Sequence, residues 1–261
     1  METLKGLPVA NAINEKIIEE MKDWKGRKFH ILQLCVLVKR PDDMSYERGA
    51  TKKMEKSRIQ MYFIYIFLLI LIMILFRKNL TRLMKMRILT EFFFLRPLPK
   101  HLDEKAIENR IASVKDLDGI SPMNLAKVYA GDPTGYGPCT AEAVIEMLDY
   151  AGVDLKGKRA VVIGRSLVIG KPVAMMLMKK NATVTVCHTK TVDMPGVCKG
   201  AEVLVAAAGV AKMVDKSFVA DGAVVIDVGI NVDEDGNLCG DVDLEDVTGN
   251  ASVCTPVPEE E

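Results

Sequence analysis

The sequence predicts an α/β fold in two domains, the second of them built on a parallel sheet. Two observations carry this prediction. Short β-branched runs alternate with helix-length segments in the second half of the chain, which is typical of βαβ units. The first of these runs ends in a glycine turn at Gly164, the local geometry used by Rossmann-like folds to hold a dinucleotide.

Four strands are expected in the second domain, at 160–163, 182–187, 203–208 and 224–228, with a helix at 173–180 after the first of them. In a parallel sheet the ligand lies at the carboxyl ends of the strands. The sequence therefore predicts one crevice whose cofactor-binding residues are Gly164, Arg165, Ser166, His188, Thr189, Gly209 and Ile230.

The first turn is the most informative part of this crevice. Gly164 allows a tight turn, and a helix starting near Ser166 would direct unbonded N–H groups at a pyrophosphate. The next glycine is Gly170, so the spacing differs from the common GxGxxG pattern. On spacing alone, a strand–turn–helix without a ligand remains an alternative.

The charges near this turn favour NADP over NAD. An NAD site usually has an acidic residue about 20 positions after the glycine turn, where it binds the ribose 2′-hydroxyl. Here the second strand leads into His188, Thr189 and Lys190, and Arg165 lies in the first turn. Cationic groups pair with a 2′-phosphate. The alternative is that Arg165 and Lys190 are ordinary solvated charges.

Several motifs occur in a fixed order along the chain, and together they resemble the bifunctional methylenetetrahydrofolate dehydrogenase/cyclohydrolase family. They are KDLDG at 115–119, PCTA at 138–141, GRS at 164–166, GKP at 170–172, DVGIN at 227–231, GDVD at 240–243 and TPVP at 255–258, preceded by SYERGATKK at 45–53 and RPLP at 96–99.

The resemblance implies a folate-facing N-terminal catalytic domain at 1–138 and an NAD(P)-binding domain at 139–258. It implies oxidation of 5,10-methylenetetrahydrofolate with NADP, followed by hydrolysis of the methenyl product to 10-formyltetrahydrofolate. Asp118 matches the aspartate that binds the pterin, and Tyr46 matches the tyrosine that orients the folate. On pattern alone, Asp118 could instead be a buried structural residue and Tyr46 a core aromatic. The resemblance also implies a homodimer formed through the nucleotide domain and a cytoplasmic enzyme.

Two departures from the family pattern make the hydrolytic half less secure. Ala50 stands where many members have the lysine that promotes hydrolysis. On a helix, Lys53 shares a face with Tyr46 and Ala50 and is the candidate replacement, although a solvated surface lysine is the alternative. Leu95 replaces a glutamine and cannot form its hydrogen bond.

Residues 61–76 are all apolar and are followed by a basic stretch through Arg87, which is unusual for a soluble enzyme. Three interpretations are open: a short membrane helix, an unusual core helix, or a frameshift. With A/T-rich codons, a neighbouring frame of 78–94 can encode an amphipathic helix, a turn and a strand, so we favour a frameshift over a membrane location. On this hypothesis, the printed 61–95 segment would lack a native helix and strand.

The family pattern continues past TPVP with a glycine-rich loop and a helix, whereas the sequence ends at Glu261. We expect this difference to weaken both sites. The alternative function is accordingly an inactive, frameshifted or truncated relative that retains only NADP binding.

Composition excludes several other classes of protein. The formal net charge is zero, which gives no indication of a nucleic-acid partner. The six cysteines are scattered without metal-ligand spacing, and reduced cytosolic thiols are expected. The remaining expected elements are helices at 9–22, 46–57 and 141–150, the last capped by Thr140, and a strand at 31–38.

Overall fold

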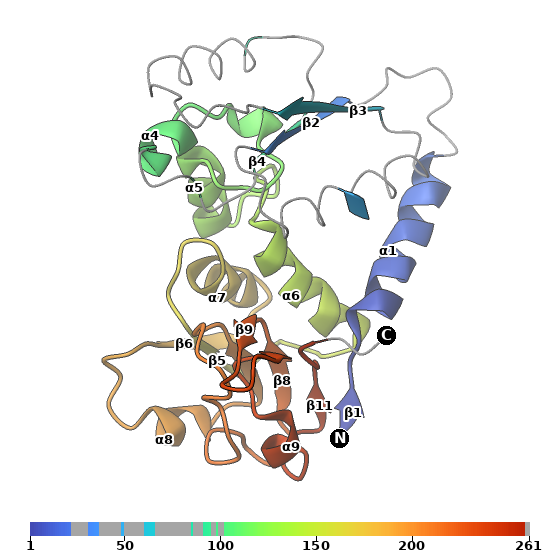
Figure 1. The fold of residues 1–261 in the computed structure, drawn as a ribbon. Coiled ribbons are helices and arrows are strands. Elements are labelled where there is room, and N and C mark those ends of the chain that lie inside the picture. Colours follow the sequence, from blue (N-terminus) through green and yellow to red (C-terminus); the bar gives the residue numbers. More distant parts are fainter. Residues whose placement is uncertain are drawn as a thin grey trace. The chain divides into compact units, whose positions relative to one another are not determined.

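A computed structural model describes residues 1–21, 31–36, 48–49, 60–65, 85, 91–94, 98 and 102–258 (Figure 1). The chain forms two compact units. One combines Met1–Lys16 with Pro138–Glu261, and the other comprises Ile17–Gly137. The first unit is therefore discontinuous in sequence, because the N-terminal residues join the C-terminal half.

The first unit contains a six-stranded parallel sheet in the order β1-β11-β8-β7-β5-β6. Its strands are β1 (Glu2–Thr3), β5 (Arg159–Ile163), β6 (Thr183–Cys187), β7 (Val203–Ala206), β8 (Val224–Asp227) and β11 (Val253–Cys254). The four expected strands are confirmed as β5 to β8, with β7 ending two residues early. The mixed α/β class with a parallel Rossmann-like sheet is likewise confirmed.

Both faces of this sheet are covered, and successive residues of a strand point to opposite faces. Ala160 and Val162 of β5 pack in one core cluster with residues of α1, α6 and α7. Val161 and Ile163 pack in the other, with residues of α8, α9 and the β7–β8 connection. The β-branched runs follow from this arrangement, since neither face of the central strands meets water. The helices are α1 (Gly6–Met21), α6 (Cys139–Tyr150), α7 (Gly170–Lys179), α8 (Met194–Cys198) and α9 (Leu244–Val247).

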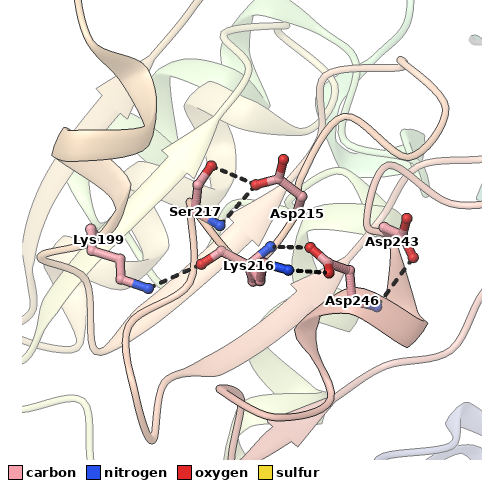
Figure 2. Close-up of polar contacts among 6 residues, drawn as sticks. All are labelled: Lys199, Asp215, Lys216, Ser217, Asp243 and Asp246. Carbon is pink, nitrogen blue, oxygen red and sulfur yellow. Dashed lines mark hydrogen bonds and ion pairs between the residues drawn. The ribbon is translucent and has the colours of Figure 1, made fainter.

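Two lysines anchor the connection between β7 and β8 (Figure 2). Lys199, which follows α8, donates from Nζ to the carbonyl oxygens of Lys216 (3.0 Å) and Val219 (2.6 Å). Lys216 binds the carboxylate of Asp246 in α9 through its backbone N–H (2.9 Å) and its Nζ (3.1 Å). The connection is thus tied to both α8 and α9.

Two expected helix starts are wrong. Helix α7 begins at Gly170 rather than near Ser166, because residues 167–169 first form a turn. Helix α6 begins at Cys139 with Pro138 as its N-cap and no capping side chain, so Thr140 lies inside the first turn. The carbonyl of Pro138 already accepts the N–H groups of Ala141 (2.9 Å) and Glu142 (3.0 Å).

The second unit contains a three-stranded parallel sheet in the order β3-β2-β4. Its described elements are β2 (Ile31–Val36), β3 (Gln60–Tyr65), β4 (Glu91–Phe94), α4 (Glu104–Glu108), the 3₁₀ turn η2 (Ser113–Lys115) and α5 (Pro122–Ala130). The strand expected at 31–38 is confirmed as β2, and the helix expected at 9–22 is confirmed as α1. Most of the helix expected at 46–57 lies outside the described residues.

The first part of the apolar run is a strand. Residues 60–65 pair in parallel with the whole of β2, from Ile31↔Gln60 to Val36↔Tyr65. The helical interpretations of 61–76 are therefore wrong for 61–65, and the rest of the run lies outside the described residues. An apolar run alone does not separate a strand from a helix, and this one begins with aromatic and β-branched strand formers. In the described part of the chain, no helix is long and apolar enough to span a membrane.

The end of the 61–95 segment also forms a strand with the amino-acid sequence given. Glu91–Phe94 pairs with β2, and the Phe92 side chain is buried. The expectation that this segment lacks its strand is therefore wrong.

Candidate nucleotide site and folate loop

The strand register places all the predicted cofactor-binding residues at the carboxyl ends of the strands of the six-stranded sheet. Ile163 pairs with Cys187 and with Ala206, and Ala206 pairs with Asp227, so these four residues form a row across the sheet. Each predicted residue lies within three positions after a member of this row. The crevice predicted at the carboxyl ends of β5 to β8 therefore has the expected set of loops.

The turn after β5 lies where the direction of the strand order reverses, between the neighbouring strands β5 and β7. From β5 the chain passes to β6 on one side, and β7 lies on the other side of β5 and leads away to β8. The loops after β5 and β7 therefore leave in opposite directions. Open α/β sheets bind their ligands at such a switch point.

The spacing between Gly164 and Gly170 has a structural reason. Gly164 has φ +125°, and a Cβ on it would overlap the carbonyl oxygen of Ala207. A Cβ on Gly170 would overlap the carbonyl of Gly164 and lie 2.9 Å from the Arg165 nitrogen. The turn after β5 is thus pressed between the β7 loop and the start of α7, and both contacts require glycine.

The backbone of this turn offers hydrogen-bond donors to a ligand. Within the described part of the chain, the N–H groups of 165–168 have no hydrogen-bond partner. The N–H groups at the start of α7 are used instead: the Oγ of Ser166 accepts those of Ile169 (3.0 Å) and Gly170 (3.3 Å). Anion-binding capacity therefore lies in the turn around Ser166, where the sequence predicts it, although the helix itself begins only at Gly170.

The side chains around this turn suit a large charged ligand. Arg165, Ser166 and Thr189 are exposed, and Ile230 is 77% exposed although it is apolar. His188 is half-buried and closes its own turn, since its Nδ1 accepts the N–H of Lys190 (3.1 Å) and its N–H donates to Thr191 Oγ1 (2.9 Å). A neutral His188 ring therefore carries its proton on Nε2.

Asp241 is a structural determinant of the site to which sequence reasoning gave no role. It is fully buried and accepts the N–H groups of Ala208 (2.5 Å) and Gly209 (3.0 Å) at Oδ2. Its Oδ1 accepts the N–H of Val210 (2.9 Å) and the side-chain amide of Asn231 (2.8 Å). The Gly209 N–H is consequently unavailable to a cofactor, and any contact from this glycine must use its other atoms.

A second buried carboxylate, Asp227, supports the neighbouring loop. It accepts the N–H groups of Gly229 (2.9 Å), Asp241 (3.0 Å) and Val242 (2.9 Å). Burial raises the pKa of Asp227 in spite of these bonds. Asp227 lies in the motif DVGIN and Asp241 in GDVD. Their presence in these motifs is the one feature of the sequence that could have indicated their importance.

The second unit places Asp118 in the loop between η2 and α5, where it is half-buried. The buried aspartate of this loop is Asp116, two positions earlier, at 1% exposure. Tyr46 and Lys53 lie outside the described residues, so the structure does not place them beside Asp118. Among the described residues, no group of three or more His, Cys, Asp or Glu side chains could hold a metal ion.

Comparison with known proteins identifies the family. The chain is 46% identical over 269 aligned residues to the bifunctional protein FolD of Clostridioides difficile, covering 98% of this chain and 90% of that protein. The chain belongs to the bifunctional FolD family. The family model of the tetrahydrofolate dehydrogenase/cyclohydrolase NAD(P)-binding domain matches residues 138–260.

Solved FolD structures have the same fold over nearly the whole chain. The bifunctional FolD enzyme of Campylobacter jejuni superposes with a TM-score of 0.91 at 32% identity, covering 99% of this chain and 92% of that one. The Trypanosoma brucei FolD, solved with NADP and an inhibitor, gives 0.87 at 30% identity, with 98% and 90% covered. The aligned length includes the anomalous apolar segment, which favours a FolD enzyme over the inactive alternative.

Proposed function

We propose that this chain oxidises 5,10-methylenetetrahydrofolate to the methenyl form with NADP and hydrolyses that product to 10-formyltetrahydrofolate. The observation that carries the proposal is the turn 165–168 at the switch point of the parallel sheet, in a chain of the FolD family. Its unpartnered N–H groups, its glycine contacts and Arg165 all fit a dinucleotide phosphate.

In this proposal the residues of each unit have separate tasks. The turn 165–168 binds phosphate oxygens, and Arg165 supplies the charge that favours a 2′-phosphate. The exposed side chain of Ile230 gives apolar contact at the same edge. When bound, NADP accepts the hydride, so the protein has to bind and orient the two reactants. Asp118 accepts hydrogen bonds from the pterin ring, and Tyr46 orients the folate.

The hydrolytic half depends on a lysine in this family, and we propose that Lys53 supplies it in place of Ala50. Dehydrogenation is then the more robust activity. Supplying methenyltetrahydrofolate directly and following the loss of its absorbance isolates the second reaction. Lys53→Ala should abolish that loss and spare dehydrogenation; unchanged hydrolysis would remove Lys53 from the mechanism.

The dehydrogenase is tested by following methenyltetrahydrofolate formation with NADP or NAD as oxidant. The expected result is product formation with a preference for NADP. Binding of NADP without oxidation of the folate would instead support the inactive alternative.

Arg165→Ala tests the cofactor preference. Loss of a charge-assisted phosphate contact should weaken NADP binding about 10- to 100-fold and leave NAD binding nearly unchanged. Arg159→Ala is the matched control, since Arg159 starts the same strand at its opposite end and is exposed beside Glu202. Isothermal titration with both cofactors measures the effect, and an equal loss for NADP and NAD would contradict a 2′-phosphate contact.

We further propose that the chain acts as a cytoplasmic homodimer. The family resemblance supports both points, and the reduced thiols of Cys139, Cys187, Cys198, Cys239 and Cys254 agree with the first of them. Sedimentation of the purified chain tests the oligomeric state.

A further inference from the structure

The loop that carries Asp118 is closed by the carboxylate of Asp116. This carboxylate is 1% exposed and accepts the N–H of Ile120 at Oδ1 (3.2 Å) and of Ser121 at Oδ2 (2.7 Å). Both bonds reach across Asp118, from the residue two before it to residues two and three after it. The backbone on either side of Asp118 is therefore joined through one buried side chain.

A buried amide holds that carboxylate in place. Asn124 is fully buried, and its Nδ2 donates to Asp116 Oδ2 (2.9 Å) and to the carbonyl of Ser113 (2.9 Å). Its Oδ1 accepts the N–H of Tyr136 (3.4 Å). Asn124 thereby connects the 3₁₀ turn before the loop, the loop itself and the segment before α6.

The backbone around Asp118 has little room to rearrange. Leu117 donates its N–H to Phe92 of β4 (3.1 Å), and Gly119 donates its N–H to the carbonyl of Asp116 (3.3 Å). Gly119 has φ +61°, and a Cβ there would overlap the Tyr136 carbonyl oxygen. The loop is fixed against β4 on one side and against the 136–137 backbone on the other.

We propose that Asp116 is a positioning residue for folate binding: its buried carboxylate, held by Asn124, determines where Asp118 stands. This inference rests on the proposed function, in which Asp118 contacts the pterin. Burying a carboxylate costs free energy unless it is fully hydrogen-bonded, and here three donors satisfy it.

Asp116→Asn tests this role with little change in shape. An asparagine oxygen can keep the bonds at the Oδ2 position, but its NH₂ group then faces the N–H of Ile120, and two donors oppose each other. The loop should shift just after Asp118. We expect the KM for methylenetetrahydrofolate to rise about tenfold or more, because small misplacements of a binding group are costly. NADP binding, measured separately by titration, should not change.

Ser121→Ala is the matched control for destabilisation. Ser121 is the N-cap of α5, and its Oγ accepts the N–H of Asn124 (3.4 Å), so the variant weakens the same helix. Its backbone N–H still binds Asp116. Thermal melting should show destabilisation in both variants, whereas only Asp116→Asn should raise the folate KM.

Asp118→Ala separates failure of this inference from failure of the proposed function. If Asp118→Ala and Asp116→Asn both raise the folate KM and Ser121→Ala does not, the positioning role stands. If Asp116→Asn melts at a lower temperature but keeps the wild-type folate KM, the positioning role is overturned while the Asp118 contact stands. If Asp118→Ala itself leaves the folate KM unchanged, the pterin contact and the positioning role both fall.

Discussion

At the scale of single residues, the thiols in the core of the first unit differ chemically from the thiol at its surface. Burial raises the pKa of Cys198 to about 12, and it raises the pKa of Cys254 to about 12 as well. Burial also raises the pKa of Cys187. Cys139, at the start of α6, is exposed. Since the thiolate is the reactive form, these residues should be modified at very different rates.

The expected outcome is that iodoacetamide at about pH 8 modifies Cys139 in the native protein and leaves Cys198 and Cys254 unmodified. Peptide mass spectrometry assigns the sites, and a urea-unfolded sample, in which every cysteine should react, is the control. Native labelling of Cys254 as fast as that of Cys139 would show that the strand it occupies opens readily.

The sequence also identifies residues better than it identifies their partners. In KDLDG it singles out Asp118, and the alternative of a buried structural aspartate turns out to describe Asp116. Neither burial nor the bond to Asn124 is visible in the pattern, because both depend on segments brought together by folding. The same holds for Asp241, whose partners at 208–210 lie about 30 positions away.

At the scale of elements, the close approach of β5, its turn and α7 depends on Gly170. Gly170→Ala should improve helix propensity and still destabilise the protein by about 1–3 kcal/mol, because the new Cβ meets backbone atoms that cannot move aside. NADP affinity should fall as well, since the displaced atoms are the Gly164 carbonyl and the Arg165 nitrogen, where the turn 165–168 begins.

Urea unfolding and NADP titration measure the two effects. Gly249→Ala is the control, as a Cβ on Gly249 meets nothing within 4 Å. A Gly170→Ala variant as stable as the wild type would mean that the turn can yield without cost.

The loops after β7 and β8 depend on Asp241 in a similar way. Asp241→Asn replaces one acceptor oxygen of this buried carboxylate by an NH₂ donor that faces the N–H donors of the loop, so the free energy of unfolding should fall by about 2–3 kcal/mol. Asp243→Asn is the control, because Asp243 caps α9 and asparagine caps helices equally well. Chemical denaturation of both variants measures the difference, and equal stabilities would contradict this role of Asp241.

At this scale the sequence predicted β5 to β8 well, because alternating β-branched runs reflect burial on both faces, but it did not predict the short helices α8 and α9. It misplaced the start of α7, since a capping serine can precede a turn before the helix. It did not predict β1 and β11, because strands of two residues have no periodicity.

At the scale of the whole molecule, stability in acid should depend on carboxylates such as Asp246 (Figure 2). The Lys216 backbone N–H, and then its ammonium group, lower the pKa of Asp246 from its ordinary value of 3.8. A lowered carboxyl pKa contributes stability above that ordinary value and loses it as the pH falls through the folded-state pKa.

Asp246→Asn should therefore be less stable than the wild type at about pH 7 and closely similar to it at about pH 2. Urea unfolding at both values tests this. Glu245→Gln is the control, since the Glu245 side chain forms no hydrogen bond or ion pair among the described residues. A constant difference across the pH range would mean that the Lys216–Asp246 pair does not carry the effect.

The pairing of Glu2 in β1 with Val253 in β11 bears on folding during synthesis as well as on the stability of the sheet. The ribosome synthesises β1 before the Ile17–Gly137 unit and β11 after it, so the β1–β11 edge of the parallel sheet closes only once Cys254 has emerged. The Ile17–Gly137 unit emerges in between and can collapse first. A ribosome that stalls before codon 253 therefore leaves β8 with one unpaired edge.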